Sequence, residues 1–133
     1  MAYISINPNP NGLYTGDCVV RALAYALDKT WHEAYIGLAV QGLIDADMPS
    51  SNRVWSDYLK SQGYQMKPII NNCSECYTVI DFCRDHPQGK FVLATGNHAL
   101  VVDDGNYYDA WDSGREYPIF YFEKKETKTN DVS

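Results

Sequence analysis

The sequence predicts an α+β fold, because its helical and extended patterns fall in separate parts of the chain. Apolar residues at helical spacing dominate the stretch from Cys18 to Asp85, and short apolar or aromatic runs typical of strands follow from Lys90 onward. The chain has 133 residues, 45% of them hydrophobic, which is enough for one domain with its own core. We expect N-terminal helices packed on a C-terminal antiparallel sheet, with the domain over 1–123 and a polar, flexible tail over 124–133.

Composition excludes several classes of partner and site. A net charge of −6 opposes binding to DNA or RNA, but it suits a neutral or basic peptide. No stretch reaches the length of a membrane span, and residues 1–8 lack the basic and apolar regions of a signal peptide. We therefore expect a cytoplasmic protein whose four cysteines are reduced, which favours a reactive thiol or a metal site over disulfides.

The first feature that suggests chemistry is Cys18. Residues 7–16 are rich in turn formers and predict an ordered loop in front of it, with a low-complexity linker as the alternative. Asp17 is a good N-cap, and the apolar run from Cys18 to Leu27 predicts a buried helix. A cysteine in the first turn lies in the positive end of the helix dipole, which favours the thiolate. Cys18 is therefore either a nucleophile or a small apolar residue of the core.

Three further helices and an edge strand are expected before the main sheet. Residues 30–33 form a capping-box pattern that starts the second helix, whose apolar residues at helical spacing are Trp31, Ala34, Tyr35, Leu38, Ala39 and Leu43. The third helix is expected over 53–61. Residues 64–70 contain a proline that favours an edge strand. The fourth helix is expected over 76–85, with Ser74 as its cap.

Cysteines near this fourth helix have the residue types of a zinc site. Cys73 and Cys76 are followed by Cys83 and His86. On one helix, Cys76 and Cys83 would lie two turns apart, about 10 Å, whereas zinc holds each sulfur at about 2.3 Å. We therefore expect no metal here, with Cys83 in the core and the other two cysteines beside the helix cap.

The last part of the chain predicts antiparallel strands. They are expected over 90–95, over a valine-rich run opened by His98, over 107–111 and over 118–122. Residues 103–106 carry the Asp-Gly signal of a tight hairpin. The return strand ends at Asp112, so a histidine and a carboxylate lie at adjacent strand ends, as a general base and its orienting group require. Asp109 competes with Asp112, because the two lie on opposite faces of that strand.

Taken together, these stretches resemble the papain-like superfamily of cysteine peptidases, and most closely the double-glycine leader peptidases and their relatives. The matching residues are Asp17-Cys18, His98 followed by Leu100-Val101-Val102, and Asp112-Ser113. The resemblance implies a papain-like fold in which Cys18 is the nucleophile, His98 is the general base and Asp112 orients the imidazole. It also favours Asp112 over Asp109 as the third member.

The chain departs from the family pattern at the oxyanion hole. Those peptidases place a glutamine shortly before the cysteine, where its side chain binds the oxyanion, and this chain has Gly12 at that position. The nearest amide side chains are Asn9 and Asn11. We expect the backbone N–H of Cys18 to supply one oxyanion donor and Asn11 to supply the second.

The expected activity is that of a small intracellular papain-like cysteine hydrolase. It would cleave a peptide, isopeptide or related amide bond through a Cys-His-Asp triad and a thioester, with a peptide or protein as substrate and no cofactor. The alternative is a catalytically inactive papain-like scaffold, of the kind that phages encode, that binds a partner protein. The sequence leaves the oligomeric state open.

Overall fold

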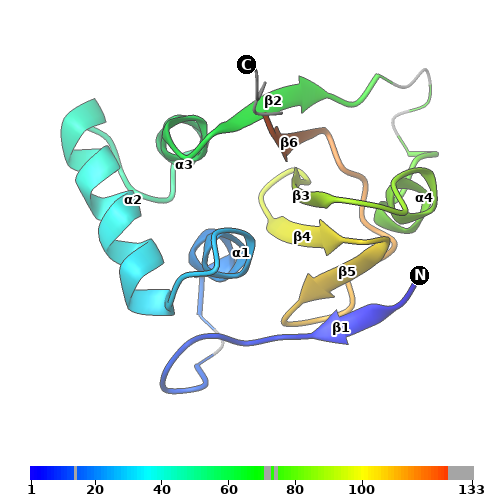
Figure 1. Ribbon diagram of the computed structural model, residues 1–133, viewed down its shortest axis with the longest axis horizontal. Coiled ribbons are helices and arrows are strands. Elements are labelled where there is room, and N and C mark those ends of the chain that lie inside the picture. The colour runs from blue at the N-terminus through cyan, green and yellow to red at the C-terminus, as the bar shows by residue number, and fades with distance from the viewer. Residues whose placement is uncertain (14, 71–72, 74, 126–133) are drawn as a thin grey trace, which may run out of the picture.

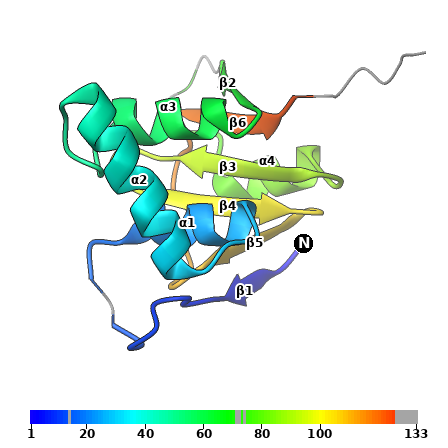
Figure 2. The same cartoon turned by 60° about the vertical axis from the view of Figure 1, so that its left-hand side comes forward.

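The computed structural model describes residues 1–13, 15–70, 73 and 75–125. In chain order its elements are β1 (Tyr3–Ser5), α1 (Cys18–Ala26), α2 (Trp31–Asp45), α3 (Asn52–Ser61), β2 (Tyr64–Pro68), α4 (Val79–Asp85), β3 (Lys90–Ala94), β4 (Ala99–Asp103), β5 (Asn106–Asp109) and β6 (Phe120–Lys124). Within these residues the strands form one six-stranded sheet in the order β1-β5-β4-β3-β6-β2. Helices α1, α2 and α3 cover one face of the sheet and α4 covers the other (Figures 1 and 2). The α+β class expected from the sequence is confirmed.

The sheet is mixed rather than purely antiparallel. Strand β1 runs parallel to β5 at one edge, a pairing that the sequence pattern did not indicate, while the β4–β5, β3–β4, β3–β6 and β2–β6 pairs are antiparallel. Strand β2 lies at the opposite edge of the sheet. Pro68, its last residue, has no N–H to donate, and at an edge this interrupts no hydrogen bonding between central strands. The N-terminal segment is therefore joined to the hairpin that carries the candidate catalytic groups.

Two apolar clusters fill the spaces between the layers. Leu23 of α1 and Trp55 of α3 are fully buried against the sheet in the first cluster, and Phe82 of α4 is fully buried in the second. Burial of such side chains contributes about 1.5–3 kcal/mol each, which holds α1 firmly across the sheet. The N-terminus of α1 is thereby fixed beside the residues that precede β4.

Helix α2 begins as predicted but buries less of its apolar surface than expected. Thr30 and Glu33 form the capping box, with Glu33 N–H donating to Thr30 Oγ1 at 3.1 Å and Thr30 N–H donating to Glu33 Oε1 at 2.9 Å. Leu38 is buried, yet Leu43 is 83% exposed, so the expected stripe is only partly a core face. Apolar side chains also point outward from Ile36, Val40 and Ile44.

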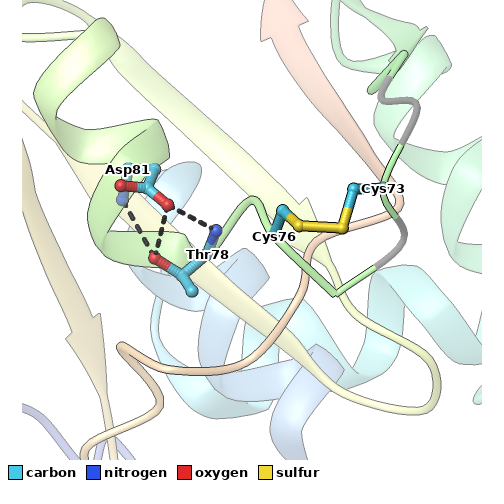
Figure 3. The surroundings of a disulfide bond; sticks show 4 residues. All are labelled: Cys73, Cys76, Thr78 and Asp81. Atoms are coloured by element: carbon cyan, nitrogen blue, oxygen red, sulfur yellow. Dashed lines mark hydrogen bonds between the residues drawn. A yellow bond between two sulfur atoms is a disulfide. The ribbon is translucent and has the colours of Figure 1, made fainter.

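Helix α4 is shorter than predicted and has a different cap. It runs over Val79–Asp85, where Thr78 and Asp81 form a capping box (Figure 3). The expected start at residue 76 is wrong because Cys76 lies in a turn, closed by a hydrogen bond from its N–H to the Cys73 carbonyl oxygen. Ser74, the expected cap, lies outside the described residues.

A disulfide joins Cys73 and Cys76 (Figure 3), so the expectation of four reduced cysteines is wrong for this pair. Their sulfur atoms are therefore not ligands of a zinc ion. The other two cysteines, Cys18 and Cys83, are free, and Cys83 is buried in the core as expected. The disulfide lies in the segment between β2 and α4.

Replacing both Cys73 and Cys76 by serine is expected to have a small effect. The disulfide closes so short a loop that its removal lowers the free energy of unfolding by at most about 2 kcal/mol. The measurement is urea unfolding of the variant beside the parent protein. A loss well beyond this range would contradict the expectation, because it would mean that the bridge organises the sheet as well as its own loop.

The C-terminal boundary differs slightly from the expected one. Strand β6 extends to Lys124, which pairs with Tyr64, and Lys125 N–H donates to the Gly63 carbonyl oxygen at 2.7 Å. The folded part therefore passes residue 123, and residues 126–133 of the expected tail lie outside the described residues. In the described part of the chain no helix is both long and apolar enough to cross a membrane.

Candidate active site

Cys18 stands where an apolar cleft meets the N-terminus of α1. It is a free, partly buried cysteine and the first residue of the helix. The cleft has a volume of about 700 Å³. Its walls come from the start of α1, from Trp31, Tyr35 and Leu38 of α2, from residues between 49 and 55, and from the segment 95–99 before β4. A molecule in this cleft would lie directly against the sulfur.

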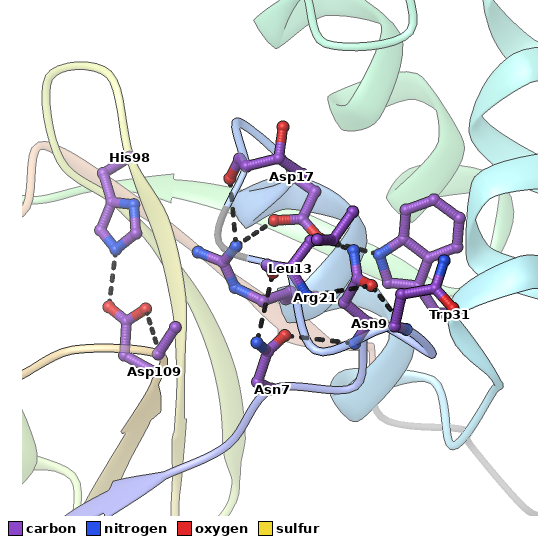
Figure 4. Close-up of polar contacts among 11 residues, drawn as sticks. Asn7, Asn9, Leu13, Asp17, Arg21, Trp31, His98 and Asp109 are labelled. Atoms are coloured by element: carbon purple, nitrogen blue, oxygen red, sulfur yellow. Dashed lines mark hydrogen bonds and ion pairs between the residues drawn. The ribbon is translucent and has the colours of Figure 1, made fainter.

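His98 lines the same cleft as Cys18 and stands immediately before β4. Its imidazole is buried, and its Nε2 is 2.6 Å from Asp109 Oδ2 (Figure 4). The His98 side chain is also close enough to the Cys18 thiol to lower its pKa. Because Nε2 is hydrogen-bonded to Asp109, Nδ1 is the ring nitrogen that is available to interact with Cys18. The cysteine and the histidine that the sequence singled out are thus brought together.

The third member of this constellation is Asp109 and not the expected Asp112. Asp112 Oδ1 accepts a hydrogen bond from the Tyr107 hydroxyl at 2.6 Å and another from Gly114 N–H at 3.0 Å. The Tyr107 hydroxyl, followed by the Gly114 N–H, lowers the pKa of the Asp112 carboxyl. Asp112 is therefore occupied in the loop after β5 and does not contact His98.

The physical reason for this correction is where β5 ends. The sequence predicted a strand to Trp111, but β5 stops at Asp109. The register pairs Val101 with Tyr108, so the next position places Asp109 opposite Leu100, near the start of β4, where His98 Nε2 reaches its carboxylate at 2.6 Å. The rule that joins a histidine and a carboxylate at adjacent strand ends holds, but the strand ends two residues earlier than the expected Trp111.

Two groups that the sequence did not single out hold the Asp109 carboxylate. Ser113 Oγ donates to Asp109 Oδ2 at 2.6 Å, and Ala110 N–H donates to Oδ1 at 2.8 Å. Ser113 is 1% exposed. Charge-assisted hydrogen bonds of this kind fix the orientation of the carboxylate. The sequence pointed to Ser113 only through the Asp112-Ser113 pair of the family resemblance, which suggested a role beside Asp112 and not beside Asp109.

The indole of Trp111 covers one face of the His98 ring. The ring centroids are 4.3 Å apart and the planes differ by 26°, an offset-stacked arrangement. Trp111 Nε1 lies 3.4 Å from Glu116 Oε2, and Glu116 also accepts a hydrogen bond from Thr95 Oγ1. The indole thereby limits the access of water to the His98 side chain and restricts its rotation.

The electrostatics of the pair favour a charged cysteine and a charged histidine. Burial alone raises the pKa of the Cys18 thiol, but hydrogen bonds from the His98 side chain and the Ala99 N–H, with the positive charges of His98 and Arg21, bring it below its ordinary value. Burial alone lowers the pKa of His98, yet the hydrogen bonds to Asp109 and Cys18 raise it to about 9. At neutral pH His98 is therefore held as an imidazolium, and the lowered pKa of Cys18 increases the thiolate fraction of its side chain.

The expected oxyanion donor Asn11 is not in the cleft. Its side chain is exposed, it is not among the residues that line the cavity, and its backbone N–H donates to Asn9 Oδ1 at 2.9 Å. Asn9 is buried but its amide Nδ2 donates to Asp17 Oδ2. The amide side chains that do line the cleft are Asn52 and Asn97. The expectation for Asn11 is therefore wrong in position.

Backbone donors at the start of α1 are left free of the usual cap. The first backbone hydrogen bond runs from Arg21 N–H to the Asp17 carbonyl oxygen, so the N–H groups of Cys18, Val19 and Val20 precede it. Asp17 is the N-cap by position, but its side chain makes no capping hydrogen bond, contrary to expectation. Cys18, Val19 and Val20 all line the cleft. An oxyanion formed at Cys18 would find these donors.

A metal-ion site is not built into the described residues. They contain no group of three or more His, Cys, Asp or Glu side chains that could hold an ion. His86, one of the residues that suggested a zinc site, stacks on Phe82 with ring centroids 3.8 Å apart. Its Nδ1 lies within hydrogen-bond distance of the Phe82 carbonyl oxygen.

No protein-family model, curated protein or solved structure matches this chain.

Proposed function

We propose that the protein is a cysteine hydrolase that cleaves a peptide, isopeptide or related amide bond at Cys18. The observation that carries the proposal is the chain of contacts from the Cys18 sulfur to the His98 imidazole and from His98 Nε2 to Asp109 at 2.6 Å, at the edge of an apolar cleft. A nucleophile, a base in hydrogen-bond reach and a third group that orients the base are the parts that acyl transfer requires. The papain-like resemblance of the sequence supports the same chemistry.

The reaction proceeds in two balanced halves. The Cys18 thiolate attacks the carbonyl carbon of the scissile amide, and the resulting oxyanion is stabilised by N–H donors at the start of α1. The His98 imidazolium then gives its Nδ1 proton to the leaving nitrogen as the C–N bond breaks, which leaves a thioester on Cys18. In the second half, neutral His98 takes a proton from water, the hydroxide attacks the thioester, and the acid leaves as the thiolate reforms.

Asp109 orients the base in both halves. It accepts a hydrogen bond from the His98 Nε2–H, which leaves Nδ1 to exchange the proton that moves between sulfur, water and leaving group. It also stabilises the imidazolium, in line with the raised pKa of His98, about 9. We expect hydrolysis to fall as the pH rises through about 9, because neutral His98 can no longer protonate the leaving nitrogen.

The first test is the alkylation of Cys18 by iodoacetamide. At pH 6.5 we expect Cys18 to react at least about tenfold faster than an ordinary free thiol, since a lowered pKa leaves more thiolate. Mass spectrometry of the labelled protein gives the rate at each cysteine. Cys83 is the internal control, because it is buried and burial raises the pKa of its thiol to about 11. Labelling of Cys18 at the rate of a free thiol would contradict the proposal.

A second candidate is a non-enzymatic scaffold that binds a partner protein. The observation that favours it is the apolar outer side of α2, where Ile36 is 61% exposed and Ile44 is 71% exposed. Apolar patches of this kind mark protein-binding surfaces. The same alkylation experiment separates the two candidates, because a scaffold has no need of an activated Cys18. A reactive Cys18 together with turnover of a peptide substrate would favour the hydrolase.

A further inference from the structure

Asp17, the residue before the candidate nucleophile, has a backbone conformation that is unusual for a helix cap. Asp17 has φ −108° and ψ 24°, outside the extended region that a capping residue normally adopts. A capping Asp17 would accept a hydrogen bond from Val19 or Val20 N–H in the first turn of α1. It would also bring a full negative charge to the helix end at which Cys18 and a reaction oxyanion need positive potential.

The Asp17 carboxylate instead points into a buried polar network (Figure 4). Its Oδ1 forms an ion pair with Arg21 one turn along α1. Its Oδ2 accepts hydrogen bonds from Trp31 Nε1 at 2.9 Å and from Asn9 Nδ2 at 3.2 Å. Asp17 is 6% exposed and Arg21 is 3% exposed. Three donors from three segments thus hold one carboxylate away from the end of its own helix.

We propose that Asp17 is a positioning residue for the reaction at Cys18. Arg21, Trp31 and Asn9 hold and neutralise its carboxylate, so that the first-turn N–H groups of α1 stay free for the negative charge that develops at Cys18 and on the substrate oxygen. The inference rests on the proposed function, because it assigns these residues a role in that reaction. It also accounts for a charged pair buried beside an otherwise apolar helix.

Arg21 is placed to act on both the carboxylate and the cleft. Its guanidinium carbon lies 5.5 Å from the centre of the Trp111 ring, which in turn stacks on His98. The guanidinium Nη2 is buried and has no hydrogen-bond partner among the described residues. A buried cation in this position offsets the charge of Asp17 and stabilises a thiolate nearby. Without Arg21, the Asp17 charge would be uncompensated next to Cys18.

The test is the pH dependence of Cys18 alkylation in Arg21→Gln and in the double variant Arg21→Gln/Asp17→Asn. The single variant leaves the Asp17 charge without its cation, so we expect the midpoint of the pH profile to rise by about one unit, or about tenfold slower labelling on the acid side. The double variant removes both charges, and we expect its midpoint to return most of the way to that of the parent protein. Arg84→Gln is the matched control, because Arg84 is paired with Asp81 on the exposed surface of α4.

Each outcome has a separate meaning. An unchanged midpoint in Arg21→Gln overturns the inference, while rapid labelling of Cys18 keeps the proposed function intact. A double variant as impaired as the single variant also overturns it, because the pair would then serve only to hold the structure. Slow labelling of Cys18 in the parent protein removes the proposed function and the inference with it. If Arg21→Gln does not fold, Trp31→Phe decides in its place, since it removes one donor to Asp17 and should raise the midpoint.

Discussion

Replacing His98 by alanine is expected to lower kcat/KM for amide hydrolysis by about 10,000-fold. In the proposed mechanism His98 carries the proton between sulfur, leaving nitrogen and water, and among the described residues it is the one histidine that lines the cleft. The variant should also react more slowly with iodoacetamide at pH 6.5, by about tenfold or more, because the thiol loses the imidazolium that lowers its pKa. The alkylation measurement needs no knowledge of the substrate.

His32→Ala is the matched control for this variant. His32 is exposed in the first turn of α2, where its ring contacts Trp31 edge-on. We expect this variant to keep both the labelling rate and the hydrolytic activity of the parent protein within about twofold. Circular dichroism checks that His98→Ala is folded. If the folded variant is labelled as fast as the parent protein, the imidazole does not activate Cys18 and the proposed mechanism fails.

The second large effect separates two aspartates that are close in the sequence. Asp109→Ala is expected to lower kcat/KM by at least about 100-fold, because the His98 imidazole loses the group that orients it and stabilises its charged form. Asp112→Ala should change kcat/KM by no more than about threefold, since its partners are Tyr107 and Gly114. The measurement is steady-state kinetics on any peptide or isopeptide substrate that the parent protein turns over, with thermal unfolding of both variants beside it.

The pH profile of Asp109→Asn gives an independent reading of the same contact. Asp109 is a cause of the raised pKa of His98, so removing its charge should lower that pKa from about 9 toward the ordinary value. The alkaline limb of hydrolysis should then move to lower pH, because the imidazolium loses its proton earlier. If the alkaline limb moves in Asp112→Asn and stays in place in Asp109→Asn, Asp112 is the aspartate that acts on His98 and the role proposed for Asp109 is wrong.

Much of the local structure follows from the sequence because it depends on neighbouring residues. The capping box of Thr30 and Glu33, the start of α1 at Cys18 and the hairpin at Asp104-Gly105 were predicted and are present. Both turn residues have positive φ, 49° at Asp104 and 79° at Gly105, as a primed hairpin turn requires. The proximity of Cys18 and His98 was expected from the papain-like resemblance, since it depends on how α1 packs across the sheet.

Features that depend on distant residues could not be predicted in the same way. The apolar residues of α2 suggested a buried stripe, yet whether Leu43 is covered depends on which element packs over it. Strand β1 was missed because its three residues carry little pattern and form a strand only by pairing with β5. The disulfide between Cys73 and Cys76 reflects how the turn brings their sulfur atoms together, which their spacing permits but does not require.

The sequence by itself singled out Cys18, His98 and the helix-and-hairpin frame that carries them, because each is encoded within a few consecutive residues. Only the tertiary structure decided between Asp109 and Asp112, excluded Asn11 from the cleft and turned Asp17 away from its own helix. The end of β5 depends on its partner strands, and the orientation of Asp17 depends on Arg21, Trp31 and Asn9. Short-range backbone preferences choose an element, whereas the direction of a buried polar side chain is set by the partners that burial brings to it.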